Sequence, residues 1–339
     1  MAIKVSGTTV IDNNRNITNV GNIGDSNTVY FGNGSNLSGV ESGTHEFVAS
    51  GNIPNGTTVV VNTDGTVGIV TLTGSSNPGI GSTTQISSTG TPFTSSVYDP
   101  VNQKVVVLYR DSESYVVVGT VTGDSISFGS PVNVLDPVTV SSSIRNMSYP
   151  VMTYAGSGKI VILWKAPMQS HYIYSVAGIV SGNTISFGPY RSFEGSNTST
   201  SQHQITYDPD NDKVIVAYRD ATNNSGRVRL GTVYEAIDPN VPISIDWQGN
   251  AHEFSDTDNV YATSLVYDPV NKKVVIAYVD SGSGSGGNGK SLVGTVLPDP
   301  SLTQNNFTMT FGPTTTFDTN ITGNWMGGQI SSVYDSFRC

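Results

Sequence analysis

The sequence contains almost no cysteine and no long hydrophobic run. Its one cysteine among 339 residues is Cys339, so a disulfide within the chain is excluded and stability must come from packing and hydrogen bonds. No stretch approaches the ~18 to 20 apolar residues of a membrane-spanning helix. The N-terminus, from Met1 to Gly7, lacks the apolar core of a signal peptide. We therefore expect a protein that is made in a cytoplasm and is not inserted into a membrane.

Charge is also scarce, and positive charge most of all. Only 12% of the residues are charged, with 16 Lys and Arg against 26 Asp and Glu, and the formal net charge is −10. That balance repels phosphate backbones and anionic membrane surfaces. Nucleic acid is therefore not expected as a partner.

Metal-binding patterns are missing as well. The four histidines have no metal-ligand spacing and no neighbouring cysteine; they are His45, His171, His203 and His252. The residues at 256–259 carry side-chain oxygens at alternating positions, so a calcium-binding loop is an alternative there. The segment lacks the glycine and the distal glutamate of a dedicated calcium site. We expect no metal and no cofactor.

The abundant residues indicate an all-β protein. Its 37 glycines, with many Ser, Thr and Asn, fit a turn-rich chain, and a repeat of more than fifty residues runs along it. Each copy reads roughly Tyr-Asp-Pro-x-Asn-x-Lys, an apolar run, Tyr-Arg-Asp, a loop, Val-Gly-Thr-Val, and Ser-Ile-Ser-Phe-Gly-x-Pro. The anchor tyrosines are 56, 53, 60 and 67 residues apart; they are Tyr98, Tyr154, Tyr207, Tyr267 and Tyr334.

Each copy predicts four antiparallel strands. The first strand ends at the anchor tyrosine, Asp-Pro-x-Asn forms a tight turn, and the second strand is a β-branched run such as Lys104 to Tyr109. The third strand carries Gly-Thr-Val or a variant, and the fourth carries Ser-Ile-Ser-Phe-Gly. Aspartates that recur after the second strand are expected to cap turns; they are Asp111, Asp220 and Asp280. Four strands per copy match a β-propeller blade.

We expect five such blades, because blades that are apolar on both faces must stack. Four are predicted near 92–134, 148–193, 202–254 and 262–317. The fifth is predicted as a composite, in which 55–90 supplies a second and a third strand and 328–339 supplies a first strand. Alternatively, the chain ends inside a fifth blade of a longer array. The β-propeller domain then covers 46–339, after an extended N-terminal arm at 1–45.

The arm is too short to bury a core of its own. It alternates apolar and polar residues in short bursts, and we expect it to order against another chain or a docking surface. Its candidate docking side chains are apolar or aromatic: Ile3, Val5, Val10, Ile17, Tyr30 and Phe31.

Four phrases of the sequence are distinctive: IKVSGTTVIDNNRNITNV, YFGNGSNLSGV, PNGTTVVVNTDGTVGIV and YDPVNQKVVVLYRD. In these the chain resembles tail-fibre-like virion structural proteins of marine tailed phages, and of cyanophages in particular. The resemblance implies an arm that attaches to other virion proteins of the tail or baseplate, often as a homotrimer, and a distal β domain that faces the host. The chain departs from it in being short for a long fibre and in having no heptad shaft.

One segment, Gly284 to Ser291, satisfies the phosphate-loop pattern G-x-x-x-x-G-K-[ST]. A phosphate loop needs a helix after it, whereas the sequence predicts a third strand from Leu292. We therefore interpret the segment as a loop between two strands.

Irregular loops mark the predicted recognition surface. The turns between first and second strands are nearly uniform, but the loops between second and third strands and the links between blades differ in every copy. Drift of unconstrained loops explains the difference equally well, yet loops on a rigid scaffold commonly carry recognition. The candidate receptor contacts are exposed side chains that suit sugar faces: Tyr115, Tyr172, Tyr190 and Arg227.

These features predict a non-enzymatic virion component of the phage tail, which docks by its arm and contacts a host-surface glycan or protein with its propeller. No recurring pair of carboxylates compels catalysis. The alternative is a glycan-degrading propeller of the depolymerase or sialidase type. A cellular adhesin is a third hypothesis, which the missing secretion signal disfavours.

Overall fold

The structure is a computed structural model that describes residues 3–6, 8–11, 48–55, 59–69, 81–88, 90, 93–136, 138–166, 172–193, 203–220, 222–235, 241–249, 251–255, 260–281, 286–299, 307–322 and 332. Contacts within the chain divide it into two units, Met1–Gly79 and Ile80–Cys339. The predicted division into an arm at 1–45 and a propeller domain at 46–339 stays a prediction.

The first unit contains two small antiparallel hairpins. They pair β1 (Ile3–Val5) with β2 (Thr8–Ile11), and β3 (Val59–Val61) with β4 (Val67–Ile69). Ala49 adds a parallel bridge to Val67. The β3 and β4 strands are those that the sequence predicts for the composite blade.

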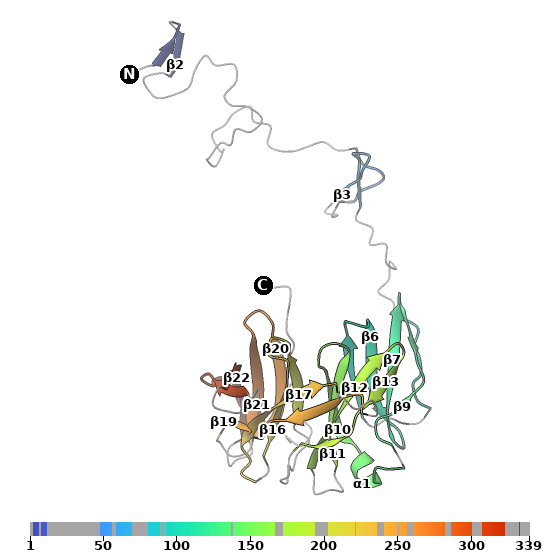
Figure 1. The fold of residues 1–339 in the computed structure, drawn as a ribbon. Coiled ribbons are helices and arrows are strands. Elements are labelled where there is room, and N and C mark those ends of the chain that lie inside the picture. Colours follow the sequence, from blue (N-terminus) through green and yellow to red (C-terminus); the bar gives the residue numbers. More distant parts are fainter. Residues whose placement is uncertain are drawn as a thin grey trace. The chain divides into compact units, whose positions relative to one another are not determined.

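The second unit contains four antiparallel sheets of one design, which follow one another in chain order (Figure 1). The first sheet has β5 (Thr94–Asp99), β6 (Lys104–Arg110), β7 (Ser114–Thr122), β8 (Ser125–Phe128) and β9 (Val132–Asn133). The helix α1 (Ser142–Arg145) follows. The second sheet has β10 (Ser148–Tyr154), β11 (Lys159–Ala166), β12 (Tyr172–Ser181), β13 (Thr184–Phe187) and β14 (Arg191–Ser192).

The other two sheets repeat this order. The third has β15 (Gln204–Asp208), β16 (Lys213–Arg219), β17 (Gly226–Tyr234), β18 (Ser244–Trp247) and β19 (His252–Ser255). The fourth has β20 (Val260–Asp268), β21 (Lys273–Asp280), β22 (Gly286–Pro298), β23 (Phe307–Phe311) and β24 (Thr315–Thr322). The all-β class and the four antiparallel strands per copy are confirmed.

Strand alternation explains why these sheets stack face to face. In β11, Ile160, Ile162 and Trp164 join the hydrophobic cluster shared with the first sheet, whereas Val161 and Leu163 join the cluster shared with the third. All five side chains are fully buried. Because successive side chains of a strand point to opposite faces, one apolar run serves two cores. Each such side chain contributes about 1.5–3 kcal/mol when buried, so a single sheet would leave much of this stabilisation unused.

Three hydrophobic clusters join the sheets in order. One joins the first and second sheets, one the second and third, and one the third and fourth. None of the three contains residues of both the first and the fourth sheet. The predicted composite blade stays a prediction, because all of 328–339 except Ser332 lies outside the described residues.

The fourth strand of each sheet is interrupted, which the sequence analysis missed. In the first sheet, β8 pairs with Gly119–Thr122 of β7, and β9 pairs with Tyr115 and Val116 along the same edge. Between them Gly129 donates its N–H to the Val118 carbonyl at 2.9 Å. A Cβ at Gly129 would lie only 2.0 Å from the carbonyl oxygen of Asn183, in a turn of the second sheet. The strand therefore breaks where the next sheet approaches its backbone.

Helices play little part in the described residues. None of those described is long and apolar enough to span a membrane.

Candidate functional site

The strand order gives the four sheets two chemically different ends. The turn end carries the turns between first and second strands and between third and fourth strands. The loop end carries the loops between second and third strands and the links between sheets. The repeated polar groups of the turn end are the alternative to a binding surface at the loop end.

At the turn end, three copies of the Asp-x-x-Asn turn have the same hydrogen bonds. In each, one aspartate oxygen accepts the N–H groups two and three residues on at 2.9–3.2 Å, and the other accepts the asparagine Nδ2 at 2.7 Å. The pairs are Asp99 with Asn102, Asp208 with Asn211, and Asp268 with Asn271. This is the local bonding that Asp and Asn provide in turns.

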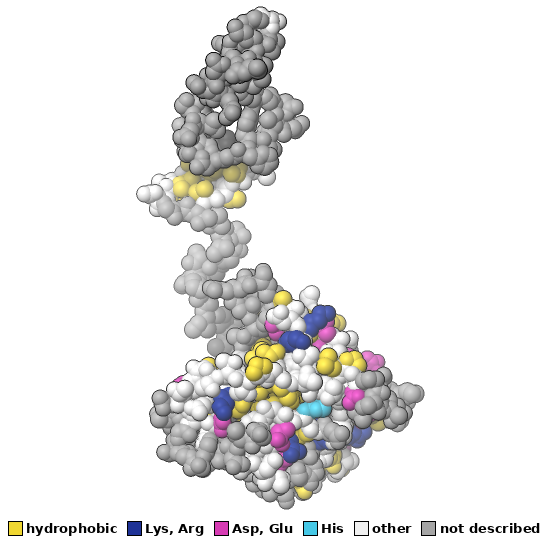
Figure 2. Space-filling model, turned by 90° about the vertical axis from the view of Figure 1, so that its left-hand side faces the viewer, with side chains coloured by type: hydrophobic (Ala, Val, Ile, Leu, Met, Phe, Trp, Pro, Cys, Tyr) yellow, Lys and Arg dark blue, Asp and Glu magenta, His cyan; other side chains and the backbone are white. Residues whose placement is uncertain are grey.

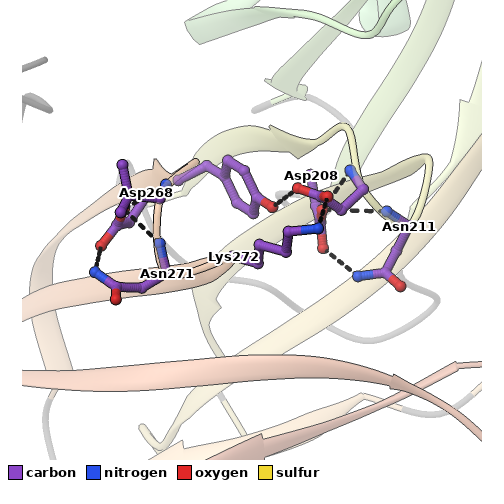
Figure 3. Close-up of polar contacts among 8 residues, drawn as sticks. Asp208, Asn211, Asp268, Asn271 and Lys272 are labelled. Carbon is purple, nitrogen blue, oxygen red and sulfur yellow. Dashed lines mark hydrogen bonds and ion pairs between the residues drawn. The ribbon is translucent and has the colours of Figure 1, made fainter. Parts of the chain in front are cut away.

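The turns of neighbouring sheets also bind one another (Figure 3). Tyr267 donates its hydroxyl to Asp210, and Lys272 Nζ lies 2.8 Å from Asp210 Oδ1. The hydrogen bond from Lys272, and then that from Tyr267, lower the pKa of Asp210. Between the first two sheets, Lys104 Nζ donates to Asn183 Oδ1 at 2.9 Å. Some polar groups of the turn end therefore hold neighbouring sheets together.

At the loop end, two of the predicted contact residues lie near each other. Tyr172 and Tyr190 both pack at the margin of the cluster between the first and second sheets. Tyr190 meets Tyr174 edge-on at 5.9 Å between ring centroids, and Tyr174 stacks on Trp164 at the same distance. Tyr172 and Tyr190 are half-buried, in contrast to the full exposure expected from the sequence. Each presents only part of its ring to solvent.

Tyr190 lines a groove of about 590 Å³ between the first and second sheets. One wall runs along 132–140 and the other along 185–190. The exposed carboxylate of Asp136 lies on this groove and accepts the Val138 N–H at 2.8 Å and the Thr139 hydroxyl at 3.0 Å. The Val138 N–H, followed by the Thr139 hydroxyl, lowers the pKa of Asp136. An aromatic ring and a carboxylate that stays ionised at neutral pH can together receive the faces and hydroxyl groups of a sugar.

Sequence reasoning did not select Asp136. A signal was available, because Asp136-Pro137 is the same dipeptide that opens the repeated turns. The signal was hard to recognise because this dipeptide lies in a link between sheets, and the links differ in length from copy to copy.

The other two predicted contacts lie elsewhere. Tyr115, half-buried on β7, stacks on Tyr109 at 5.7 Å between centroids. Arg227 on β17 is held by Asp220, with Nε to Oδ2 at 3.1 Å, and more loosely by Glu253 at 3.6 Å. The four candidates therefore do not form one site, and the guanidinium of Arg227 is already paired.

The recurring aspartates largely act as expected. Asp111 accepts the N–H of Ser112 at 2.6 Å, and Asp220 accepts that of Thr222 at 2.8 Å. Asp280 differs, because it pairs with Lys290 on the neighbouring strand. The loop predicted for the phosphate-loop look-alike is wrong for most of the segment, because Gly286 to Ser291 belong to the strand β22. This strand continues to Pro298, so no helix directly follows the segment. Gly284 and Ser285 lie outside the described residues.

The remaining candidates are placed only in part. Of the docking residues, Ile3, Val5 and Val10 belong to β1 and β2, whereas Ile17, Tyr30 and Phe31 lie outside the described residues, as does the calcium-loop alternative at 256–259. Within the described ranges, no group of three or more His, Cys, Asp or Glu side chains is placed to hold a metal ion.

Comparison with protein-family models gives no match, and comparison with curated proteins also gives none.

Proposed function

We propose that the chain is a structural protein of a tailed-phage virion, of tail-fibre type, in which the N-terminal segment attaches to other tail or baseplate proteins. The four sheets are then blades of a propeller whose loop end contacts the host surface. A homotrimer is part of the proposal, because the resemblance of the sequence to phage tail fibres implies one. The function is binding and not catalysis.

The groove beside Tyr190 is the observation that carries the proposal. It is concave, it lies at the irregular end of the sheets, and it combines an aromatic ring with the Asp136 carboxylate. At the turn end, by contrast, Asp210 pairs with Lys272 and Lys104 donates to Asn183, so these polar groups already have partners in the chain. A host-surface glycan is the partner that this combination suits best.

The test is binding of the labelled full chain to cyanobacterial cells and to lipopolysaccharide extracted from them. Tyr190→Ala and Asp136→Asn are each expected to weaken binding about 5- to 30-fold, since loss of one such contact costs about 1–2 kcal/mol. Tyr98→Ala is the matched control, because Tyr98 is an exposed tyrosine at the turn end (54%) and should leave binding unchanged.

Thermal melting of each variant shows whether it is folded. Wild-type protein that binds neither probe, or folded groove variants that bind as the wild type does, would contradict the proposal. Reducing ends released from the polysaccharide over time would instead favour the glycan-degrading alternative.

A further inference from the structure

The outer face of the fourth sheet is apolar but less covered than the corresponding faces of the other sheets. A glycine recurs at the same position of the third strand in each sheet, and the residue before it lies on the face toward the next sheet. Val118, Ala177 and Leu230 are at most 1% exposed at this position, whereas Val293 is 44% exposed. Leu297, on the same face of β22, is 41% exposed. Figure 2 looks at the side of the unit where the fourth sheet lies in Figure 1, and hydrophobic side chains gather there among polar ones.

One described residue from the C-terminal part of the chain touches this sheet. The hydroxyl of Ser332 lies 2.7 Å from the hydroxyl of Ser264 on β20, at hydrogen-bonding distance. Ser264 is 5% exposed. The two residues are 68 positions apart, so this is a long-range contact.

The contact has the geometry of the repeat. Counted from the anchor tyrosines, Ser332 is two residues before Tyr334, and Ser264 is three residues before Tyr267. Ile205 and Val151 hold these same two positions in the third and second sheets, and both belong to the cluster between those sheets. First strands of successive sheets also lie next to each other along the unit. Ser332 therefore meets the fourth sheet where the first strand of a following sheet would meet it.

The opposite end of the unit shows a similar arrangement. A Cβ at Gly81 would lie 2.0 Å from the carbonyl oxygen of Asp124, the same distance as that between a Cβ at Gly129 and Asn183. Thr84 also donates its hydroxyl to the Ile126 carbonyl at 3.0 Å. The segment from Gly81 thus lies against the first sheet as the segment from Gly129 lies against the second.

We propose that the outer face of the fourth sheet is the binding face for residues 329–335 of this chain, which form the first strand of a fifth sheet. Within this segment, Ser331-Ser332-Val333-Tyr334-Asp335 repeats the residues Ser95-Ser96-Val97-Tyr98-Asp99 that end the first strand of the first sheet. The inference concerns the architecture and does not depend on the proposed host contact.

Cysteine cross-linking of the full chain tests the register. In a Cys339→Ser background, Ser264→Cys with Ser332→Cys is expected to form a disulfide within the chain on mild oxidation, because the two hydroxyls are already in contact. Ser264→Cys with Ser331→Cys is the matched control, and it should cross-link about tenfold more slowly or not at all, because neighbouring strand residues point to opposite faces. Peptide mass spectrometry identifies the bond.

Melting curves of the reduced double variants establish that both are folded. Equal cross-linking of the two pairs would contradict a strand in this register. Free thiols in the Ser332 pair after oxidation, or bonds only between chains, would also overturn the proposal, and the second result would show that another copy occupies the face.

Discussion

At the turn end, one aspartate in each of three turns holds the turn between the first and second strands by hydrogen bonds. In the fourth sheet, Asp268 binds two backbone N–H groups and the side chain of Asn271, and the same set recurs at Asp99 and Asp208. The Asn271 side chain, and then its backbone N–H, lower the pKa of Asp268. An aspartate whose pKa is lower in the folded than in the unfolded chain stabilises the fold only while it is ionised.

We expect Asp268→Asn to lower the melting temperature at pH 7. The stabilisation by ionised Asp268 is fully present above the unfolded pKa of about 3.9, and it is lost as pH falls through the lower folded value. The difference between wild type and variant should therefore shrink below about pH 4. Melting curves from pH 7 to pH 3 measure it, and a difference that is constant over this range would contradict the account.

At the scale of the element, the tightest restraint is the close approach of the fourth strands of the first and second sheets to the sheet that follows each of them. A Cβ at Gly188, just after β13, would lie 1.7 Å from the carbonyl oxygen of Ile243 in the third sheet. Backbone cannot move aside as a flexible side chain can, so a methyl group here must push the two sheets apart.

We therefore expect Gly188→Ala to reduce the free energy of unfolding by about 1–3 kcal/mol, in the range of overpacked cores. Gly249→Ala is the matched control, since a Cβ there meets nothing within 4 Å, and its change should stay within about 0.5 kcal/mol. Urea denaturation of both variants measures the effect. Equal stability of the two would show that the second and third sheets are not packed as described.

The sequence predicted the four long strands of each sheet because they repeat their turn residues and apolar runs. It did not predict β9 or β14, which have two residues each and therefore no measurable alternation. Nor did it predict that Gly81 lies against the first sheet, since that position depends on contact with the Asp124 carbonyl and not on a local pattern. No local pattern showed that Tyr115 stacks on Tyr109 or that Arg227 pairs with Asp220, because these contacts depend on how neighbouring segments are placed in the folded sheet.

For the whole unit, Ile80–Cys339, the central claim is that four sheets pack in chain order, so that the inner two are covered on both faces. Val107 of β6, on the outer face of the first sheet, is only half-buried, whereas its equivalents Ile162 of β11 and Val216 of β16 are fully buried. Local opening of a strand requires breaking its contacts on both faces, so the inner sheets should open least often.

Amide hydrogen exchange of the full chain, followed by mass spectrometry, tests this claim most directly. Peptides from β11 and β16 should exchange most slowly, those from β6 and β21 faster, and those from the β3–β4 hairpin fastest, because that hairpin has two short strands and the exposed Val60. Exchange in β11 and β16 that is as fast as in β6 would contradict a stack in which the second and third sheets are enclosed by their neighbours.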